Sequence, residues 1–244
     1  MNHPVFLFPK SKTTLRDWYA QSLMKKIQDA MVAAEAGNIT SMETFLILAR
    51  AYCDRSGQVL DAQEIQSLEQ NGYMNGIKKK LREATVAAKI GDANSMEKAF
   101  ELIHIYAQKA GISLNENDYD AVKKEGYTKG IERSLENAWN HALVGNVPLM
   151  EVLLDVVKKY RDKGGLPLDE VRVQAIIKEG CARGVEAKLK EAEIYAQAGD
   201  AEGMDAAFST AFALAEKNSL PFDEAKARNI RKMKFNPKEV NLSC

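Results

Sequence analysis

Apolar residues recur along this chain at the spacing of helical faces. In residues 73–89 they occupy positions i, i+4, i+7 and i+11, which lie on one side of an α-helix. These positions are held by Ile77, Leu81, Ala84 and Ala88. Similar stripes follow over residues 95–109 and over the shorter stretch 116–124. Because no segment shows the alternation of a half-buried strand, the pattern predicts an all-α protein.

This three-helix pattern occurs four times at a constant interval, without an insertion. The repeats cover residues 18–71, 72–125, 126–179 and 180–233. When the four repeats are aligned, we call each set of equivalent positions a column. Two columns hold one residue type throughout: Gly37, Gly91, Gly145 and Gly199, and Met42, Met96, Met150 and Met204. Repetition of this kind is typical of stacked helical repeats. We therefore expect an α-helical solenoid, or superhelix, of four three-helix repeats with about twelve helices.

The two ends of the chain depart from the repeat. Residues 1–17 are expected to form an N-terminal extension, residues 18–233 a single α-helical repeat domain, and residues 234–244 a C-terminal tail. The first repeat carries Trp18 and Ser22 where later repeats have glycines. This difference is expected of a repeat with no neighbour before it.

Glycine, asparagine and aspartate mark the predicted helix boundaries. Gly91 is expected to end the first helix of the second repeat in the left-handed conformation, which glycine adopts at little cost. Either Asp92 or Ser95 then caps the next helix. The third helix of each repeat is expected to begin with an N-cap between two apolar residues, a hydrophobic staple. These caps are Asp61, Asn115, Asp169 and Asp223.

A second glycine motif recurs where one repeat meets the next. Its first glycines are expected to end the third helix of the preceding repeat, and they are Gly72, Gly126 and Gly180. Its second glycines fall in the first turn of the following helix, where a missing side chain lets another backbone approach, and they are Gly76, Gly130 and Gly184. A phosphate-binding glycine loop would need a preceding strand, and the pattern predicts none.

Charge and composition narrow the function classes. The 244 residues include 34 basic and 34 acidic side chains, and this balance argues against a dedicated nucleic-acid binder. The apolar run from Val5 to Phe8 is too short for the core of a signal peptide or for a membrane span. We therefore expect a cytoplasmic protein, although export by a route without a cleavable signal stays open.

No set of residues stands out as a catalytic or metal-binding constellation. The histidines and cysteines lie at spacings that match no metal motif, and they are His3, His104, His141, Cys53, Cys181 and Cys244. Cys53 and Cys181 fall in columns expected to pack rather than react. We expect no cofactor and no enzymatic activity. An enzyme with its site in a concave groove of the solenoid is kept as an alternative.

The expected function is a protein-protein interaction module or scaffold, because stacked helical units present extended binding surfaces. Variable columns offer a candidate hot spot formed by Trp139, Asn140, His141 and Tyr195, since aromatic residues dominate many interfaces. Trp139 could instead fill a gap between repeats. The expected partner is another protein or peptide.

A second candidate surface is the basic stretch 226–238, which contains no acid. Its candidate binding residues are Arg228, Arg231, Lys232 and Lys234. One interpretation is a solvated helix face, with cations placed favourably near a helix C-terminus. The other is a docking patch for an acidic partner, an anionic membrane or nucleic acid.

Overall fold

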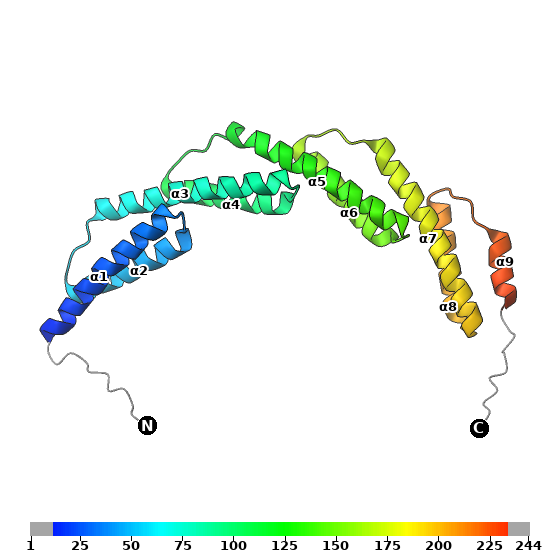
Figure 1. Ribbon diagram of the computed structural model, residues 1–244, viewed down its shortest axis with the longest axis horizontal. Coiled ribbons are helices and arrows are strands. Elements are labelled where there is room, and N and C mark those ends of the chain that lie inside the picture. The colour runs from blue at the N-terminus through cyan, green and yellow to red at the C-terminus, as the bar shows by residue number, and fades with distance from the viewer. Residues whose placement is uncertain (1–11, 234–244) are drawn as a thin grey trace, which may run out of the picture. The chain divides into compact units, whose positions relative to one another are not determined.

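The computed structural model describes residues 12–233, and these form nine α-helices and no strand (Figure 1). The prediction of an all-α fold is confirmed for this part of the chain. Contacts divide the chain into two compact halves, Met1–Gly126 and Tyr127–Cys244, which are described separately below. The first helix begins at Lys12, within the stretch expected to be an extension. Lys234 and the predicted tail lie outside the described residues.

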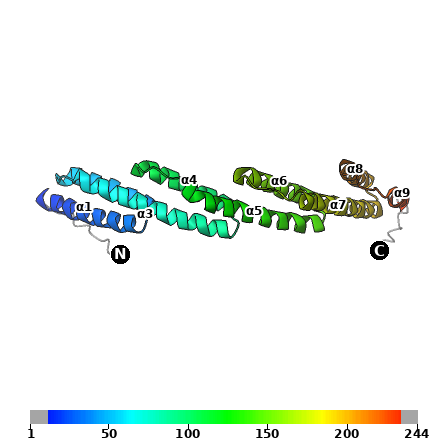
Figure 2. The ribbon, with the colours of Figure 1, turned by 90° about the horizontal axis from the view of Figure 1, so that it is seen from above.

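The N-terminal half is built from two antiparallel helix pairs and the start of a fifth helix. α1 (Lys12–Glu35) packs against α2 (Ile39–Ser56), and α3 (Ala62–Lys89) packs against α4 (Ala93–Ala110). α3 also contacts α1, and the two lie side by side in Figure 2. α5 begins at Asn117 and runs on to Leu143 in the other half. Buried alanines of α1, with Met42 and Leu46 of α2, form the centre of this core.

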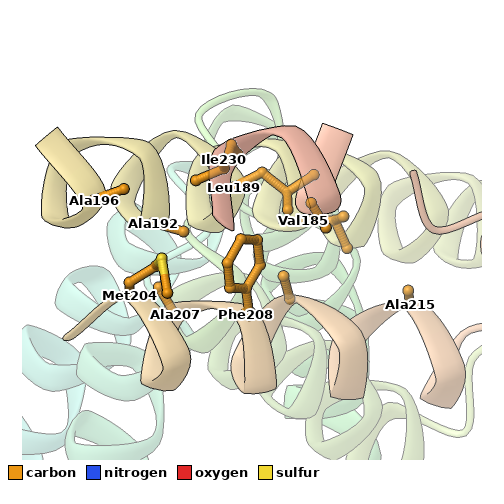
Figure 3. Close-up of a cluster of buried hydrophobic side chains, with 11 residues drawn as sticks. Val185, Leu189, Ala192, Ala196, Met204, Ala207, Phe208, Ala215 and Ile230 are labelled. Carbon is orange, nitrogen blue, oxygen red and sulfur yellow. The ribbon is translucent and has the colours of Figure 1, made fainter. Parts of the chain in front are cut away.

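The C-terminal half contains the remainder of α5 and four further helices, which are α6 (Val147–Gly164), α7 (Glu170–Ala198), α8 (Ala201–Lys217) and α9 (Glu224–Met233). α7 pairs with α8 and also contacts α9. In the core of this half, Phe208 of α8 lies below Leu189 of α7 and Ile230 of α9 (Figure 3). Ala192 and Ala211 are fully buried there, and small side chains of this kind let paired helices approach closely.

The predicted helix caps are observed. The glycines between paired helices have φ between 62° and 75°, in the left-handed region, and they are Gly37, Gly91, Gly145 and Gly199. The choice between Asp92 and Ser95 is resolved, because the Asp92 side chain accepts a hydrogen bond from the Ser95 amide at 3.0 Å. The staple caps also accept hydrogen bonds from backbone amides of the helices they precede, and they are Asp61, Asn115, Asp169 and Asp223.

The prediction that Gly72, Gly126 and Gly180 end helices is wrong. Each is buried in the interior of a long helix, in α3, α5 and α7 respectively. The third helix of one predicted repeat and the first helix of the next are therefore continuous. For this reason the described residues form nine helices rather than about twelve.

These glycines are buried because a methionine occupies the space beside them. A Cβ atom added to Gly72 would overlap the sulfur of Met42. The same relation joins two further pairs, Met96 with Gly126 and Met150 with Gly180. Glycine inside a helix costs about 1 kcal/mol relative to alanine, and the close packing of a fully buried methionine offsets this cost. We call the three pairs the methionine–glycine joints.

A second close approach accompanies the joints. A Cβ atom on Gly37 would lie 2.8 Å from the carbonyl oxygen of Asn75, next to Gly76. In the C-terminal half, a Cβ on Gly145 would lie 2.8 Å from the carbonyl oxygen of Arg183, next to Gly184. The turn between two paired helices thus rests on the following long helix.

The expected place of Gly76, Gly130 and Gly184 in the first turn of a helix is wrong, because all three lie inside long helices. The turn glycines do approach the backbone at Gly76 and Gly184, but the space of the missing side chain is taken mainly by side chains, Ile39 at Gly76 and Val147 at Gly184.

Each half also contains an ion pair between two of its helices, α2 and α4 in the N-terminal half and α6 and α8 in the C-terminal half. Glu43 accepts hydrogen bonds from Lys109 at 2.6 Å and from the Tyr73 hydroxyl at 2.7 Å. Burial raises the pKa of Glu43, but these hydrogen bonds and the Lys109 charge outweigh burial and lower it. Its contribution to stability is therefore present above the ordinary carboxyl pKa and lost as pH falls through the lowered value. In the C-terminal half, Glu151 accepts from Lys217 at 2.9 Å.

Gly72→Ala is expected to lower the free energy of unfolding by about 1–3 kcal/mol, because the added methyl group overpacks the joint with Met42. Urea unfolding measures the loss. Met42→Ala alone leaves a cavity and is also destabilising. The double variant should be more stable than the sum of the two single losses implies. Strict additivity of the two losses would contradict the joint.

Ser219→Gly is expected to raise the free energy of unfolding by about 0.5–1 kcal/mol. Among the described residues, Ser219 is the one non-glycine residue with positive φ, at 52°. The other predicted repeats have glycine at this position. As a control, Gly111→Ser should destabilise, because Gly111 has φ 68° and nothing within 4 Å of an added Cβ. Thermal melts of both variants that shift in the same direction would refute this explanation.

Candidate interaction surface

The proposed hot-spot residues lie on two helices of the C-terminal half. Trp139 and Asn140 are exposed near the end of α5, and His141 is half-buried. The side chain of Trp139 is 38% exposed, so most of it is packed against the protein. This partial exposure is compatible with both roles considered for Trp139.

Tyr195 lies far from Trp139 along the helices. α7 meets the end of α5 where Gly180 contacts Ala142, and Tyr195 is about four helical turns further along α7. At 5.4 Å per turn this is about 22 Å. The Tyr195 ring packs against the core of the C-terminal half and next to Gly203. It contributes to packing at the other end of α7.

Two of the three basic candidates on α9 make intramolecular contacts. The Arg231 guanidinium lies over the Phe208 ring, 4.8 Å from its centroid. Arg228 pairs with Glu224 at 3.3 Å, while Lys232 is exposed. Phe208, Phe212 and Phe222 join both arginines in lining a groove of about 460 Å³ beside α9. The aromatic residues of this groove were not predicted, because they come together with the arginines only when α9 packs against α8.

A groove also lies in the N-terminal half, between α1 and the first part of α3. Its volume is about 880 Å³. Apolar residues form most of its lining, among them Leu23, Met24, Ile27, Met31, Val59, Leu60, Ile65 and Leu68. Sequence reasoning missed it because the groove arises only when two helices are packed side by side.

A third feature is a set of exposed branched apolar residues at the ends of the long helices. We call them the corner residues, and they are Val32, Val86, Ile90, Val144 and Ile194. Their exposed fractions lie between 60% and 71%. Val32, Val86 and Ile194 share one column of the repeating pattern, and Ile90 and Val144 share the column four positions later. Residues four apart lie on the same helix face, so both columns belong to the same face at the end of a long helix.

The titratable groups of the described residues can be compared with the requirements of a metal site and of a reactive cysteine. No group of three or more His, Cys, Asp or Glu side chains is placed there to hold a metal ion. The Cys181 thiol is buried, and burial raises its pKa, with a smaller contribution from Glu151 that Lys217 opposes. A raised pKa disfavours the reactive thiolate, so the expectation of packing for Cys181 fits its position.

Among the nine described helices, none has the length and apolar character that crossing a bilayer requires. No protein-family model matches the chain, and no curated protein and no solved structure is significantly similar to it. Its function is therefore inferred from the surfaces above.

Trp139→Ala is expected to lower the free energy of unfolding by about 1–2 kcal/mol, because most of the indole is packed against the protein. Urea denaturation measures this change. Asn140→Ala, at the neighbouring exposed position, should change stability by less than about 0.5 kcal/mol. Equal stabilities for the two variants would show that Trp139 does not contribute to packing.

Proposed function

We propose that this chain is a non-enzymatic scaffold, a solenoid of helical repeats that presents binding surfaces to other proteins or peptides. The solenoid is supported by contacts that recur at fixed sequence intervals. In every methionine–glycine joint the same length of chain separates the two partners, and successive joints follow at the interval of the repeat. The pairs Glu43–Lys109 and Glu151–Lys217 each span 66 residues. Structures of this kind commonly serve as binding surfaces.

The corner residues are the observation that carries the proposal. A single exposed apolar side chain on a protein surface is ordinary and needs no explanation. Here Val32, Val86 and Ile194 are each more than 60% exposed at the same position of the pattern. Core packing does not account for them, because they face away from it. A surface that binds partners in the first, second and fourth repeats would account for their recurrence.

The basic end receives less support as a binding site for nucleic acid or anionic membrane. Arg231 is stacked on Phe208, and Arg228 is paired with Glu224. Both contacts reduce the positive charge available to a phosphate group. The two contacts therefore give Arg228 and Arg231 intramolecular roles within the C-terminal half.

A triple variant tests the scaffold proposal. Replacing Val32, Val86 and Ile194 by Asn copies Asn140, the residue that occupies this column in the third repeat. The variant should fold normally, because the changed side chains are exposed. In quantitative mass spectrometry of proteins captured from native lysate, it should lose specific partners by about tenfold, the effect of roughly 1.4 kcal/mol of binding free energy.

The matched control replaces Lys25, Lys79 and Arg133 by Ala, which copies Ala187 at another exposed column. The control should retain the partners that the triple Asn variant loses. Indistinguishable capture by the wild type, the triple Asn variant and the control would contradict a binding role for the corner residues.

A further inference from the structure

We propose that the groove between α1 and α3 binds a basic amphipathic helix of a partner protein, an inference that rests on the scaffold function above. The groove is lined by residues from 23–35 of α1 and from 63–75 of α3, together with the loop 58–61 that joins α2 to α3. The stretch 23–35 of α1 makes more than three helical turns, and three turns span about 16 Å. A partner helix of about three turns therefore matches the groove in length.

The floor of the groove is suited to the apolar face of a helix. Leu23 is buried, and Ile27, Ile65 and Leu68 pack partly against the core beneath. Met24 is 69% exposed and Val59 is 93% exposed at its edge. Methionine side chains are flexible and adapt to the shape of a bound partner. Apolar floors of this kind bind amphipathic helices in many complexes.

The rim of the groove is acidic and therefore favours a positively charged partner helix. Three acidic residues lie along it, Glu35, Asp61 and Glu64, and its described lining includes no Lys, Arg or His. All three are exposed. A helix that presents leucines to the floor and lysines or arginines to the rim would be complementary in both shape and charge.

The C-terminal half contains an equivalent groove that lacks this character. It is smaller, about 490 Å³, and is lined by α7 and by the loop and helix that follow α8. At positions equivalent to Met24 and Glu64 it has Glu186 and Lys226. Lys190 adds a second positive charge. Its lining balances these two bases against two acids, Glu186 and Asp223. It therefore lacks the uniformly acidic rim that would favour a basic helix, and it supplies an internal control.

The probe is a fluorescein-labelled 15-residue peptide of leucine and lysine, with leucines spaced to form one face of a helix. A matched peptide carries glutamate in place of every lysine. Fluorescence anisotropy at physiological salt should show saturable binding of the lysine peptide to the full chain. The glutamate peptide should bind at least tenfold more weakly. Equal binding of the two peptides would overturn the proposal.

Charge variants locate the binding site. Glu64→Lys copies Lys226 and should weaken lysine-peptide binding about tenfold or more. Lys226→Glu should change it less than twofold. Glu216→Lys makes the same charge change as Glu64→Lys at an exposed position of α8, and it should also have little effect. Equal loss in Glu64→Lys and Glu216→Lys would indicate nonspecific attraction and would overturn the proposal.

An apolar variant tests the floor without changing charge. Met24→Gln combined with Met31→Gln should weaken lysine-peptide binding about tenfold, because methionine contacts are lost. Unchanged affinity in this variant would count against the groove. The triple Asn variant of the corner residues should bind the peptide like the wild type. If the peptide does not bind while partner capture still depends on the corner residues, the groove proposal fails and the scaffold function stands.

Two further measurements distinguish other occupants of the groove. If the lysine peptide binds only after residues 1–11 are deleted, the chain's own N-terminal segment occupies the groove and the proposal is overturned. If sedimentation shows a dimer that Glu64→Lys dissociates, a second copy occupies it, with the same consequence. A monomeric wild type that binds the peptide through Glu64 supports the proposal.

Discussion

The packing of a methionine against a glycine is the contact on which the rest of this structure depends. Met42, Met96 and Met150 are completely buried, and each lies against a glycine in the interior of a long helix. Without a side chain at that glycine, two helices come close enough to enclose the methionine. Each joint therefore connects one helical pair with the long helix that follows it.

Other features of the fold follow from these joints. The long helix continues past the glycine, and its later part pairs with the next helix along the chain, as α3 does with α4. The turn at Gly37 packs on the backbone of Asn75 and Gly76, one turn beyond the joint. The same arrangement at Gly145 and Arg183 shows that both halves use the same local geometry.

Much of the fold was accessible from the sequence because helix caps and apolar stripes are local signals. The capping by Asp92 and by Asp61, and the burial of Met96, follow from residues close together in the chain. The continuity of α3 through Gly72 was not accessible. Glycine is a usual helix terminator, and only contact with Met42, which lies on the preceding helix α2, explains its place inside a helix. Tertiary packing there overrides the local preference.

The surfaces were predicted less well than the fold, because they too depend on tertiary packing. Trp139 could be singled out as an aromatic residue in a variable column, but its degree of burial depends on neighbouring helices. The groove beside α1 exists only because α3 lies next to it, and its acidic rim combines Glu35 with Asp61 and Glu64 from another segment. Such surfaces depend on residues that the linear pattern does not bring together.

Hydrogen exchange at the amides of residues 72–76 and 180–184 tests the central claim most directly. If methionine–glycine packing holds continuous helices together, these amides should exchange as slowly as those of residues 84–88 in the later part of α3. Exchange as fast as in the loop 58–61 would show that the helices end at the glycines, and the account of the fold would then be wrong.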